Sequence, residues 1–238
     1  MKTVFITGAS SNIGLEICRQ FLHNNWKVLA HFRTPRQELQ QIYEEHSSKV
    51  TLVQLDFSDA SNLERNLSEI KPLFETVDSF IGCAASLEPE SYGQLTQKNI
   101  AKHFHINVIP NILITQHLVP GMIRRKWGRI IYLSSVGIKF GGGVSSYSYA
   151  LSKHCLEFLP AAARGWAEEN VLANTVRVGV TDTEIHKKDR LKNMHDRIQL
   201  IPAKRMATPK EIAIFAFFLG SELNTFISNQ ILPITGGE

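Results

Sequence analysis

Two side chains four positions apart, Tyr149 and Lys153, carry the clearest chemical signal in this sequence. On an α-helix, residues with this spacing lie on one face, about 6 Å apart along the axis, so a phenol and an ammonium group would share one site. A positive charge about 4 Å from a phenolate stabilises it by about 4 kcal/mol at an effective dielectric of about 20, which lowers a pKa near 10 by about 3 units. The pair therefore predicts a tyrosine that exchanges a proton near neutral pH. A surface pair at chance spacing is the alternative.

A glycine-containing turn near the amino terminus predicts a phosphate site. Residues Thr7–Gly14 join a strand pattern to a helical pattern. Glycines at such a turn let the backbone approach a phosphate, and the first turn of the helix supplies unpaired N–H donors. The spacing differs from GxGxxG, so a tight turn without a ligand is the alternative. The candidate cofactor contacts are Gly8, Ser10, Ser11, Asn12 and Ile13.

Arg33, at the end of the second expected strand, bears on which dinucleotide binds. An acid there would bind the ribose 2′-hydroxyl of NAD, whereas an arginine pairs with the 2′-phosphate of NADP. The sequence thus favours NADP(H), with NAD(H) as the alternative cofactor and Arg36 as a substitute for Arg33. Asp56 and Phe57 follow the third expected strand. We expect Asp56 to accept a hydrogen bond from adenine, to cap a helix beginning near Ser58, or to do both.

The elements that position these groups alternate along the chain. Runs typical of strands lie at Thr3–Thr7, Val28–Phe32, Val50–Leu55, Val77–Cys83, Ile130–Leu133, Leu172–Val178 and Gln230–Ile234. Helical patterns lie near 13–24, 36–46, 60–74, 97–125, 147–169 and 209–220. This alternation predicts an α/β fold, a Rossmann-like doubly wound parallel sheet of about seven strands with helices on both faces. Residues 1–238 are expected to form a single dinucleotide-binding and catalytic domain.

Composition narrows the classes of function. The 238 residues, 43% of them hydrophobic, are enough for one sizeable core. A net charge of +4 suits an anionic ligand, but the basic residues form no long run, so no nucleic-acid partner is expected. The three cysteines lack metal-ligand spacing, so no metal is expected. Without a signal-peptide pattern or a span of about 20 apolar residues, we expect a cytoplasmic protein with no membrane partner.

Taken together, the motifs resemble those of the short-chain dehydrogenase/reductase family, and the resemblance covers essentially the whole chain. The family carries a TGxxxGxG turn, an NNAG segment, a helical asparagine, a serine after the fifth strand and a YxxxK pair. The corresponding residues are Thr7–Gly14, Gly82–Ala85, Asn107, Ser135, and Tyr149 with Lys153. Asn174–Gly179 resembles the NxVxPG segment, and Thr183, residues 205–213 and Gly236-Gly237 match later features.

The resemblance implies hydride transfer between NADP(H) and a small-molecule carbonyl or alcohol. Tyr149 would act as general acid or base, while Lys153 would lower its pKa and hold the nicotinamide ribose. Ser135 would donate a hydrogen bond to the substrate oxygen. Asn107 would hold a water in a proton path to Lys153. The family's cofactor contacts here are Ala84, Tyr149, Lys153, Val178, Gly179 and Thr183.

Three departures from the family pattern motivate a second hypothesis. Asn12 replaces a glycine, where we expect a left-handed backbone that asparagine tolerates. Cys83 replaces an asparagine, and Val178 replaces a proline. A nonenzymatic dinucleotide-sensing or scaffold protein on the same fold is therefore the alternative. Retention of Tyr149 and Lys153 favours the enzyme.

Several finer points stay open in the sequence. A Tyr–Lys spacing of seven is similar to that of enoyl reductases and would need a tyrosine where Ser146 stands, so carbonyl reduction is favoured. Ser134 is the alternative to Ser135. The candidate substrate classes are a 3-oxoacyl thioester, a sugar, a steroid-like ketone and a nucleotide-linked substrate. Arg124, Arg125, Lys126 and Arg129 suggest an acidic carrier protein as partner, or else a solvated helix end.

Two further expectations concern the surface of the molecule. The resemblance implies a homodimer or homotetramer built through the helices near 97–125 and 147–169. Segment 182–204 is the least regular part of the sequence. It is expected to be either a mobile cover over a site or a solvated helix and loop.

Overall fold

A seven-stranded parallel sheet forms the centre of the computed structural model, which describes residues 1–188 and 193–238. The strands are β1 Thr3–Thr7, β2 Lys27–Phe32, β3 Val50–Gln54, β4 Ser79–Gly82, β5 Gly128–Ser135, β6 Val171–Val178 and β7 Ile231–Ile234. They lie in the order β3-β2-β1-β4-β5-β6-β7, and each neighbouring pair is parallel. The expected sheet is confirmed. Its order reverses between β1 and β4, which is where such sheets bind ligands.

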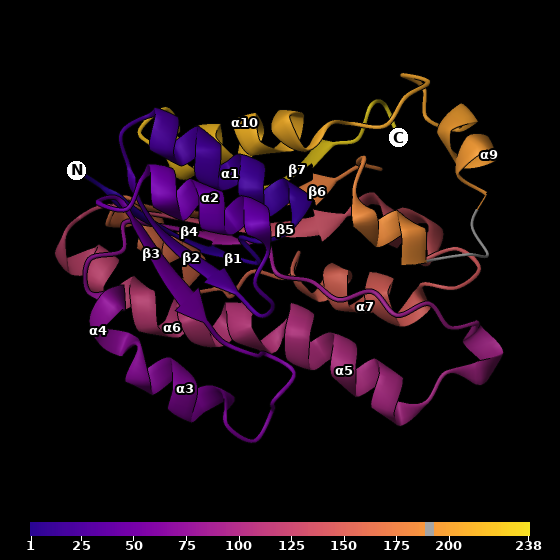
Figure 1. Ribbon diagram of the computed structural model, residues 1–238, viewed down its shortest axis with the longest axis horizontal. Helices are drawn as coiled ribbons and strands as arrows, with labels where there is room; N and C mark the ends of the chain where they lie inside the picture. Colours follow the sequence, from indigo (N-terminus) through magenta and orange to yellow (C-terminus); the bar gives the residue numbers. More distant parts are fainter. Residues whose placement is uncertain (189–192) are drawn as a thin grey trace.

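Helices cover both faces of the sheet (Figure 1). One face carries α1 Asn12–His23, α2 Gln37–Glu45 and α10 Pro209–Gly220. The other carries α3 Leu63–Glu69, α4 Lys71–Phe74, α6 Ile109–Arg124 and α8 Ala163–Glu168. The remaining helices are α5 Gln97–Asn107, α7 Tyr147–Cys155 and α9 Met194–Gln199, and short 3₁₀ turns lie at Tyr92–Gln94, Val136–Phe140 and Glu184–Lys188. Two apolar clusters, one on each side of the sheet, form the core.

Three helices predicted as continuous are interrupted, each close to a proline. The segment near 97–125 is divided into α5 and α6 at Val108, two residues before Pro110. The segment near 60–74 is divided at Ile70, before Pro72, and the one near 147–169 ends at Cys155 and resumes after Pro160. Proline lacks an N–H and disfavours a helical conformation in the preceding residue, so a new helix starts beside it.

The stretch Gln97–Arg124 has the length and hydropathy of a helix that can cross a membrane. The expectation that the sequence contains no such stretch is therefore wrong. However, 61% of its most apolar window is buried inside the protein. Helices packed against a sheet have the same composition, so the stretch is weak evidence for a membrane contact.

Segment 182–204 contains one 3₁₀ turn and the short helix α9 in its described part. The charged residues Asp189, Arg190 and Lys192 of this segment lie outside the described residues. In Figure 1, α9 lies near the end of the chain that follows β7.

Helix α10 begins with a capping box. Thr208 Oγ1 accepts a hydrogen bond from the Glu211 N–H at 3.3 Å, and the Glu211 carboxylate accepts one from the Thr208 N–H at 2.7 Å. Each bond satisfies a backbone N–H that has no partner within the helix. The cap fixes where α10 starts to cover β5 and β6.

We expect Thr208→Ala to lower the free energy of unfolding by about 1 kcal/mol, because it removes the acceptor for the Glu211 N–H. Urea unfolding measures the change. Thr208→Ser keeps the hydroxyl and is the control, with an expected change below about 0.5 kcal/mol. Equal losses in the two variants would show that the hydroxyl bond is not the cause.

Candidate active site

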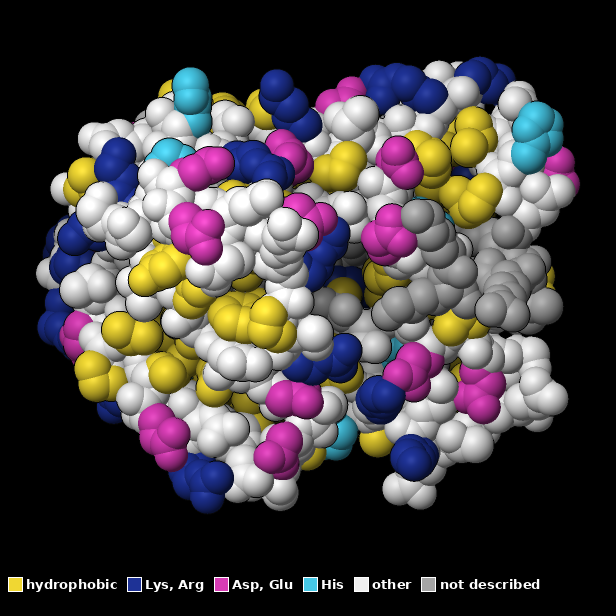
Figure 2. All heavy atoms as spheres, viewed as in Figure 1, with side chains coloured by type: hydrophobic (Ala, Val, Ile, Leu, Met, Phe, Trp, Pro, Cys, Tyr) yellow, Lys and Arg dark blue, Asp and Glu magenta, His cyan; other side chains and the backbone are white. Residues whose placement is uncertain are grey.

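The carboxyl ends of the central strands open into a cavity of about 970 Å³. This volume is at the upper end of the roughly 300–1,000 Å³ typical of ligand sites. In Figure 2, the surface is hollowed between the body of the molecule and the part that carries α9. Among the residues predicted for catalysis or cofactor binding, all line this cavity except Asn107.

The turn after β1 is closed so tightly that two positions exclude a side chain. Gly8 has φ +67°, and a Cβ on it would lie 2.8 Å from Ala84 Cα. A Cβ on Gly14 would lie 2.2 Å from the Gly8 carbonyl oxygen. The Ser11 side chain caps α1 by accepting the Gly14 N–H at 3.0 Å. The first N–H groups of α1 consequently face the cavity beside a bare backbone, as a phosphate site requires.

Asn12 does not have the left-handed backbone that we expected. It is the first residue of α1 and has no positive φ. The left-handed conformation is found at Gly8 instead. Asn12 has ordinary helical geometry, which any side chain can adopt. Its Oδ1 accepts a hydrogen bond from the Glu184 N–H at 3.3 Å. Asn12 thereby links the phosphate turn to the start of the segment that follows β6.

His31 was not among the residues predicted from the sequence. Its ring supports the turn after β1 through a hydrogen bond to the backbone of Gly8. Its Nδ1 accepts a hydrogen bond from the Gly8 N–H at 3.1 Å, and its Nε2 lies 3.2 Å from the Leu55 carbonyl oxygen. The ring stacks on Phe57 with centroids 4.1 Å apart. Burial lowers the pKa of His31 to about 4, so the ring is neutral at pH 7, with its proton on Nε2. A lone polar residue in an apolar strand was the signal in the sequence.

The two arginines near the end of β2 have different surroundings. Arg36 donates to the Ser10 carbonyl oxygen at 3.0 Å and pairs with Glu38 at 2.6 Å. Arg33 is exposed, and its guanidinium makes no hydrogen bond or ion pair with the residues that the structure describes. Arg33 is therefore the better placed of the two to bind an added phosphate.

Asp56 caps a turn rather than a helix. Its Oδ1 accepts hydrogen bonds from the Ser58 N–H at 2.8 Å and from the Ser58 hydroxyl at 2.7 Å. Helix α3 starts only at Leu63, so the expected helix start near Ser58 is wrong. The second carboxylate oxygen of Asp56 is not used in these bonds, and Asp56 is one of the residues that line the cavity.

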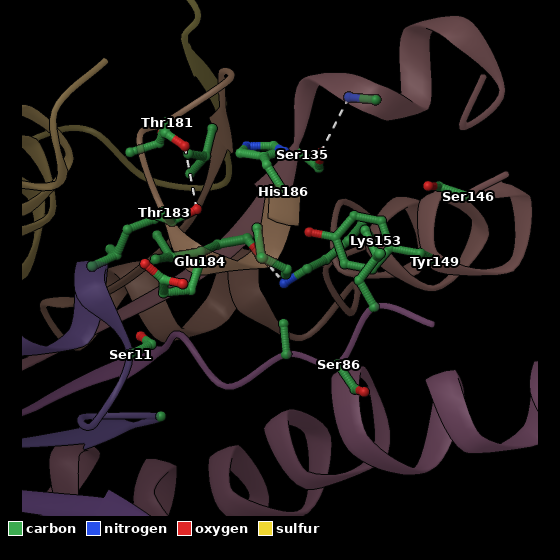
Figure 3. A pocket seen from close by; sticks show the side chains of 18 of the residues that line it. Ser11, Ser86, Ser135, Ser146, Tyr149, Lys153, Thr181, Thr183, Glu184 and His186 are labelled. Carbon is green, nitrogen blue, oxygen red and sulfur yellow. Dashed lines mark hydrogen bonds between the residues drawn. The ribbon is translucent and has the colours of Figure 1, made fainter. Parts of the chain in front are cut away.

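Tyr149 and Lys153 lie on α7 and face the cavity together with Ser135, which ends β5 (Figure 3). The Lys153 ammonium donates to the Leu133 carbonyl oxygen at 2.7 Å and lies 5.9 Å from the centre of the Tyr149 ring. Ser135 Oγ accepts the Gly137 N–H at 3.1 Å. A hydroxyl, a phenol and an ammonium group thus meet at one end of the cavity.

The pKa of Tyr149 is shifted in the direction opposite to the one we expected. Burial raises the pKa of Tyr149 to about 12, against a lowering by its hydrogen bond with Ser135. Burial also lowers the pKa of Lys153 to about 8. Both groups are desolvated, which favours their neutral forms, and the ammonium is held by a carbonyl oxygen instead of the phenol. Tyr149 is therefore a protonated acid at neutral pH.

Ser134 and Tyr147 both point away from the reacting groups. Ser134 is buried, and its Oγ lies 3.0 Å from both the Lys153 carbonyl oxygen and Glu157 Oε1. The same carboxylate forms two hydrogen bonds with Arg177, at 2.8 and 2.6 Å. Tyr147 packs edge-on against Tyr92 and does not line the cavity. Ser134 also lines the cavity, but its hydroxyl is held by these bonds, so Ser135 is the better placed of the two serines to meet a substrate together with Tyr149.

Asn107 is buried in a network beside the cavity. Its Oδ1 accepts the Ser86 N–H at 2.7 Å, and its Nδ2 donates to the Ser86 carbonyl oxygen at 3.1 Å and to Ser152 Oγ at 2.9 Å. Its own carbonyl oxygen accepts a hydrogen bond from Asn111 Nδ2 at 2.8 Å. The structure therefore does not bring the Asn107 side chain to the cavity. It ties the segment after β4 to α7.

The match to known proteins decides the family. A family model described as short chain dehydrogenase matches residues 2–194. The chain belongs to the short-chain dehydrogenase family. The expected resemblance, the Rossmann-like fold and the class of NAD(P)-dependent oxidoreductase are thereby confirmed.

Relatives of known name span nearly the full chain. The chain is 27% identical over 237 residues to the 3-oxoacyl-[acyl-carrier-protein] reductase MabA of Mycobacterium tuberculosis, covering 99% of this chain and 92% of that protein. It is 28% identical over 245 residues to an acetoacetyl-CoA reductase of Acinetobacter, covering 99% and 97%. A solved 3-oxoacyl (acyl-carrier-protein) reductase of Agrobacterium tumefaciens, with NADP bound, superposes with a TM-score of 0.87 at 23% identity and covers 100% and 94%.

Other side chains compensate for the family asparagines missing from Gly82–Ala85 in this short-chain dehydrogenase. The Thr7 hydroxyl accepts hydrogen bonds from the backbone N–H groups of Cys83 and Ala84, at 3.1 and 3.2 Å. A Cβ on Gly82 would lie 2.1 Å from Asn111 Oδ1, so an amide from α6 occupies the space next to that strand end. The β1 and β4 ends therefore remain joined.

His31 predicts a pH dependence of stability. Its pKa of about 4 lies below the value of 6.5 for a free histidine, so the unfolded chain binds the proton first as pH falls. Stability from this group is complete above pH 6.5 and is lost as pH falls towards 4. Between these pH values we expect wild type to lose up to about 3 kcal/mol more unfolding free energy than His31→Phe.

Urea unfolding at several pH values measures this difference. His23→Gln, which replaces an exposed histidine on α1, is the control and should keep the wild-type slope. Parallel pH profiles for wild type and His31→Phe would contradict the assigned neutral state.

Proposed function

We propose that this protein transfers a hydride between NADP(H) and a carbonyl or alcohol group of a small molecule. The observation that carries the proposal is the meeting of Ser135, Tyr149 and Lys153 in the cavity that also contains the phosphate turn and Arg33. The cofactor supplies or accepts the hydride. The chain binds both molecules and moves the proton.

Tyr149 is the proton donor during carbonyl reduction. With a pKa of about 12, its hydroxyl is protonated at pH 7 and donates to the carbonyl oxygen as negative charge develops there. Ser135 hydrogen-bonds the same oxygen. Lys153, whose pKa is about 8, is charged at neutral pH and stabilises the phenolate that remains. Its proton is lost as pH rises through 8, which removes this stabilisation. Alcohol oxidation uses the same groups in reverse.

The dinucleotide fits the residues along the rest of the cavity. The glycine turn and the start of α1 receive the pyrophosphate, and Arg33 receives the 2′-phosphate that distinguishes NADP from NAD. Asp56, Phe57 and Ala84 border the adenine side. Val178, Gly179 and Thr183 border the nicotinamide side together with the catalytic pair. NADP(H) is the favoured cofactor, and NAD(H) is the alternative.

Ketones next to a thioester are the first substrate class to test. The support is the naming of relatives as 3-oxoacyl and acetoacetyl reductases. The basic residues expected to meet a carrier protein lend less support. Arg129 is buried against the Asn224 carbonyl oxygen, Arg124 pairs with Glu75 and Lys126 pairs with Glu169. Arg129 therefore cannot contact a carrier protein, because its guanidinium is buried and donates hydrogen bonds inside the fold.

Several broader properties are carried by the family resemblance. We infer that residues 1–238 act as one domain, that the protein is a cytoplasmic homodimer or homotetramer, and that it has no nucleic-acid or membrane partner. The Asn107 side chain is occupied by Ser86 and Ser152, so the water that the family resemblance places beside Asn107 would be held by its backbone carbonyl oxygen.

We expect Tyr149→Phe to lower kcat by about 10²–10⁴-fold, because it removes the proton donor without changing the ring. NADPH oxidation with 3-oxoacyl thioesters and small ketones measures the rate. Tyr147→Phe, on the same helix but outside the cavity, is the control and should keep the wild-type rate. An unchanged rate in Tyr149→Phe would show that the assigned mechanism is wrong.

We expect Arg33→Ala to weaken NADPH binding by about 10-fold or more, because a charge-assisted hydrogen bond to phosphate is lost. NADH binding should change by less than about twofold. Fluorescence titration measures both, with the exposed Arg65→Ala as the control. Tighter binding of NADH than NADPH by wild type would overturn the NADP assignment. Binding of neither would favour the nonenzymatic alternative.

A further inference from the structure

An ion pair in the cavity wall has no part in the mechanism described above. Arg197 of α9 and Glu238, which follows Gly237, both line the cavity that contains Tyr149. Arg197 Nη2 lies 2.5 Å from Glu238 Oε1. The side chains are only 14% and 4% exposed, so the pair is largely removed from solvent.

The two side chains satisfy each other only in part. A guanidinium and a carboxylate can form two parallel hydrogen bonds, but a single contact joins them here. Arg197 Nη1 and Glu238 Oε2 are buried and have no hydrogen-bond partner among the described residues. Buried polar atoms are nearly always paired in folded proteins, so a free donor and a free acceptor in one wall call for a partner.

The described residues around the pair supply no such partner. The Phe140 ring lies 5.6 Å from Arg197 Cζ, and Leu200 adds further apolar surface. Asn193 and Asp196 are the neighbouring polar residues on the wall. Asn193 Nδ2 donates to Asp196 Oδ2 at 2.7 Å, and Asn193 Oδ1 accepts hydrogen bonds from the N–H groups of His195 and Asp196. Among the described residues of this part of the wall, the free nitrogen and the free oxygen are the buried polar atoms that lack a hydrogen-bond partner.

The charges of the pair indicate what kind of group would bind. Within the pair, an anion would be attracted by Arg197 and repelled by Glu238, and a cation would experience the reverse. The exposed Asp196 adds a solvent-screened negative charge that further disfavours an anion. A neutral group that both accepts and donates a hydrogen bond satisfies both free atoms without adding charge. Hydroxyl and amide groups have this property.

We propose that Arg197 and Glu238 form a specificity subsite that binds a hydroxyl or amide group of the substrate, away from the reacting carbonyl. Because both free atoms are buried, binding requires the two side chains to shift so that these atoms face the ligand. The proposal rests on the proposed function, because it assumes that the carbonyl substrate occupies this cavity. The group can come from a hydroxylated ketone, such as a sugar, or from the amide-containing arm of an acyl thioester.

Binding of matched ketones tests the subsite without requiring turnover. The protein is first saturated with NADP⁺, which cannot reduce a ketone, and each probe is added by calorimetric titration. One pair is the acetoacetyl thioester of N-acetylcysteamine and an alkyl thioester of equal length. The second pair is 6-hydroxy-2-hexanone and 2-heptanone. The first pair reports an amide and the second a hydroxyl.

We expect wild type to bind the polar member of at least one pair about 10-fold more tightly or better. Glu238→Gln replaces the accepting oxygen by a donor, and Arg197→Met removes the donor. Both should bring the ratio within each pair to about 1, with apolar probes and NADP⁺ bound as in wild type. Arg205→Gln, an exposed arginine paired with Glu211, is the control and should keep the preference.

Retained NADP⁺ binding shows that a variant is folded. A ratio near 1 in wild type for both pairs would overturn the subsite. So would tighter binding of a ketone carrying a carboxylate, such as 6-oxoheptanoate, because an anion site would then be present. Absence of NADPH-dependent turnover despite a clear preference in binding would instead contradict the proposed function and leave the subsite standing.

Discussion

The close approach of the β1 turn to the chain after β4 is the constraint on which the site depends. Gly8 lies so near Ala84 that no side chain fits between them, and Gly14 is equally close to the Gly8 carbonyl oxygen. The bonds from the Gly8 N–H to His31, and from the β4 end to Thr7, hold this arrangement from two sides. Because the strands are parallel, the same approach brings the end of β5 and helix α7 to the other side of one cavity.

Desolvation sets the pKa values of Tyr149 and Lys153. The same burial that keeps Tyr149 protonated brings the pKa of Lys153 down to about 8. A protonated phenol is suited to donating a proton, whereas a nearby ammonium matters most once the phenolate has formed. In the proposed mechanism, the charge of Lys153 therefore stabilises the phenolate that proton transfer leaves behind, and has less effect on the protonated tyrosine.

Local patterns in the sequence predicted the strands, because each strand depends on residues close together in the chain. They also singled out the turn after β1 and the residues Ser135, Tyr149 and Lys153, all of which line one cavity. The YxxxK spacing and the strand–helix alternation belong to this kind. The helix break at Val108 was not predicted, because the long apolar run was given more weight than Pro110. The direction of the Tyr149 pKa shift was not predicted either, because it is set by burial, and residue spacing carries no information about burial. Arg197 and Glu238 are separated in the chain by α10 and β7. Their pairing therefore cannot be predicted from a local sequence pattern. The same holds for His31 beneath Gly8.

Helix α7 is fastened to the sheet through Ser134, which contacts both the Lys153 carbonyl oxygen and the carboxylate that Arg177 holds on β6. The position of Tyr149, the proposed proton donor, is thus fixed by contacts between α7 and the sheet. Arg197, by contrast, lies on α9, in the segment after β6. In these proposals, the residues that transfer the proton and the residues that recognise the substrate therefore lie on different elements of the fold. Such a separation lets a lineage exchange one substrate for another by altering the outer segment while the geometry of proton transfer stays untouched.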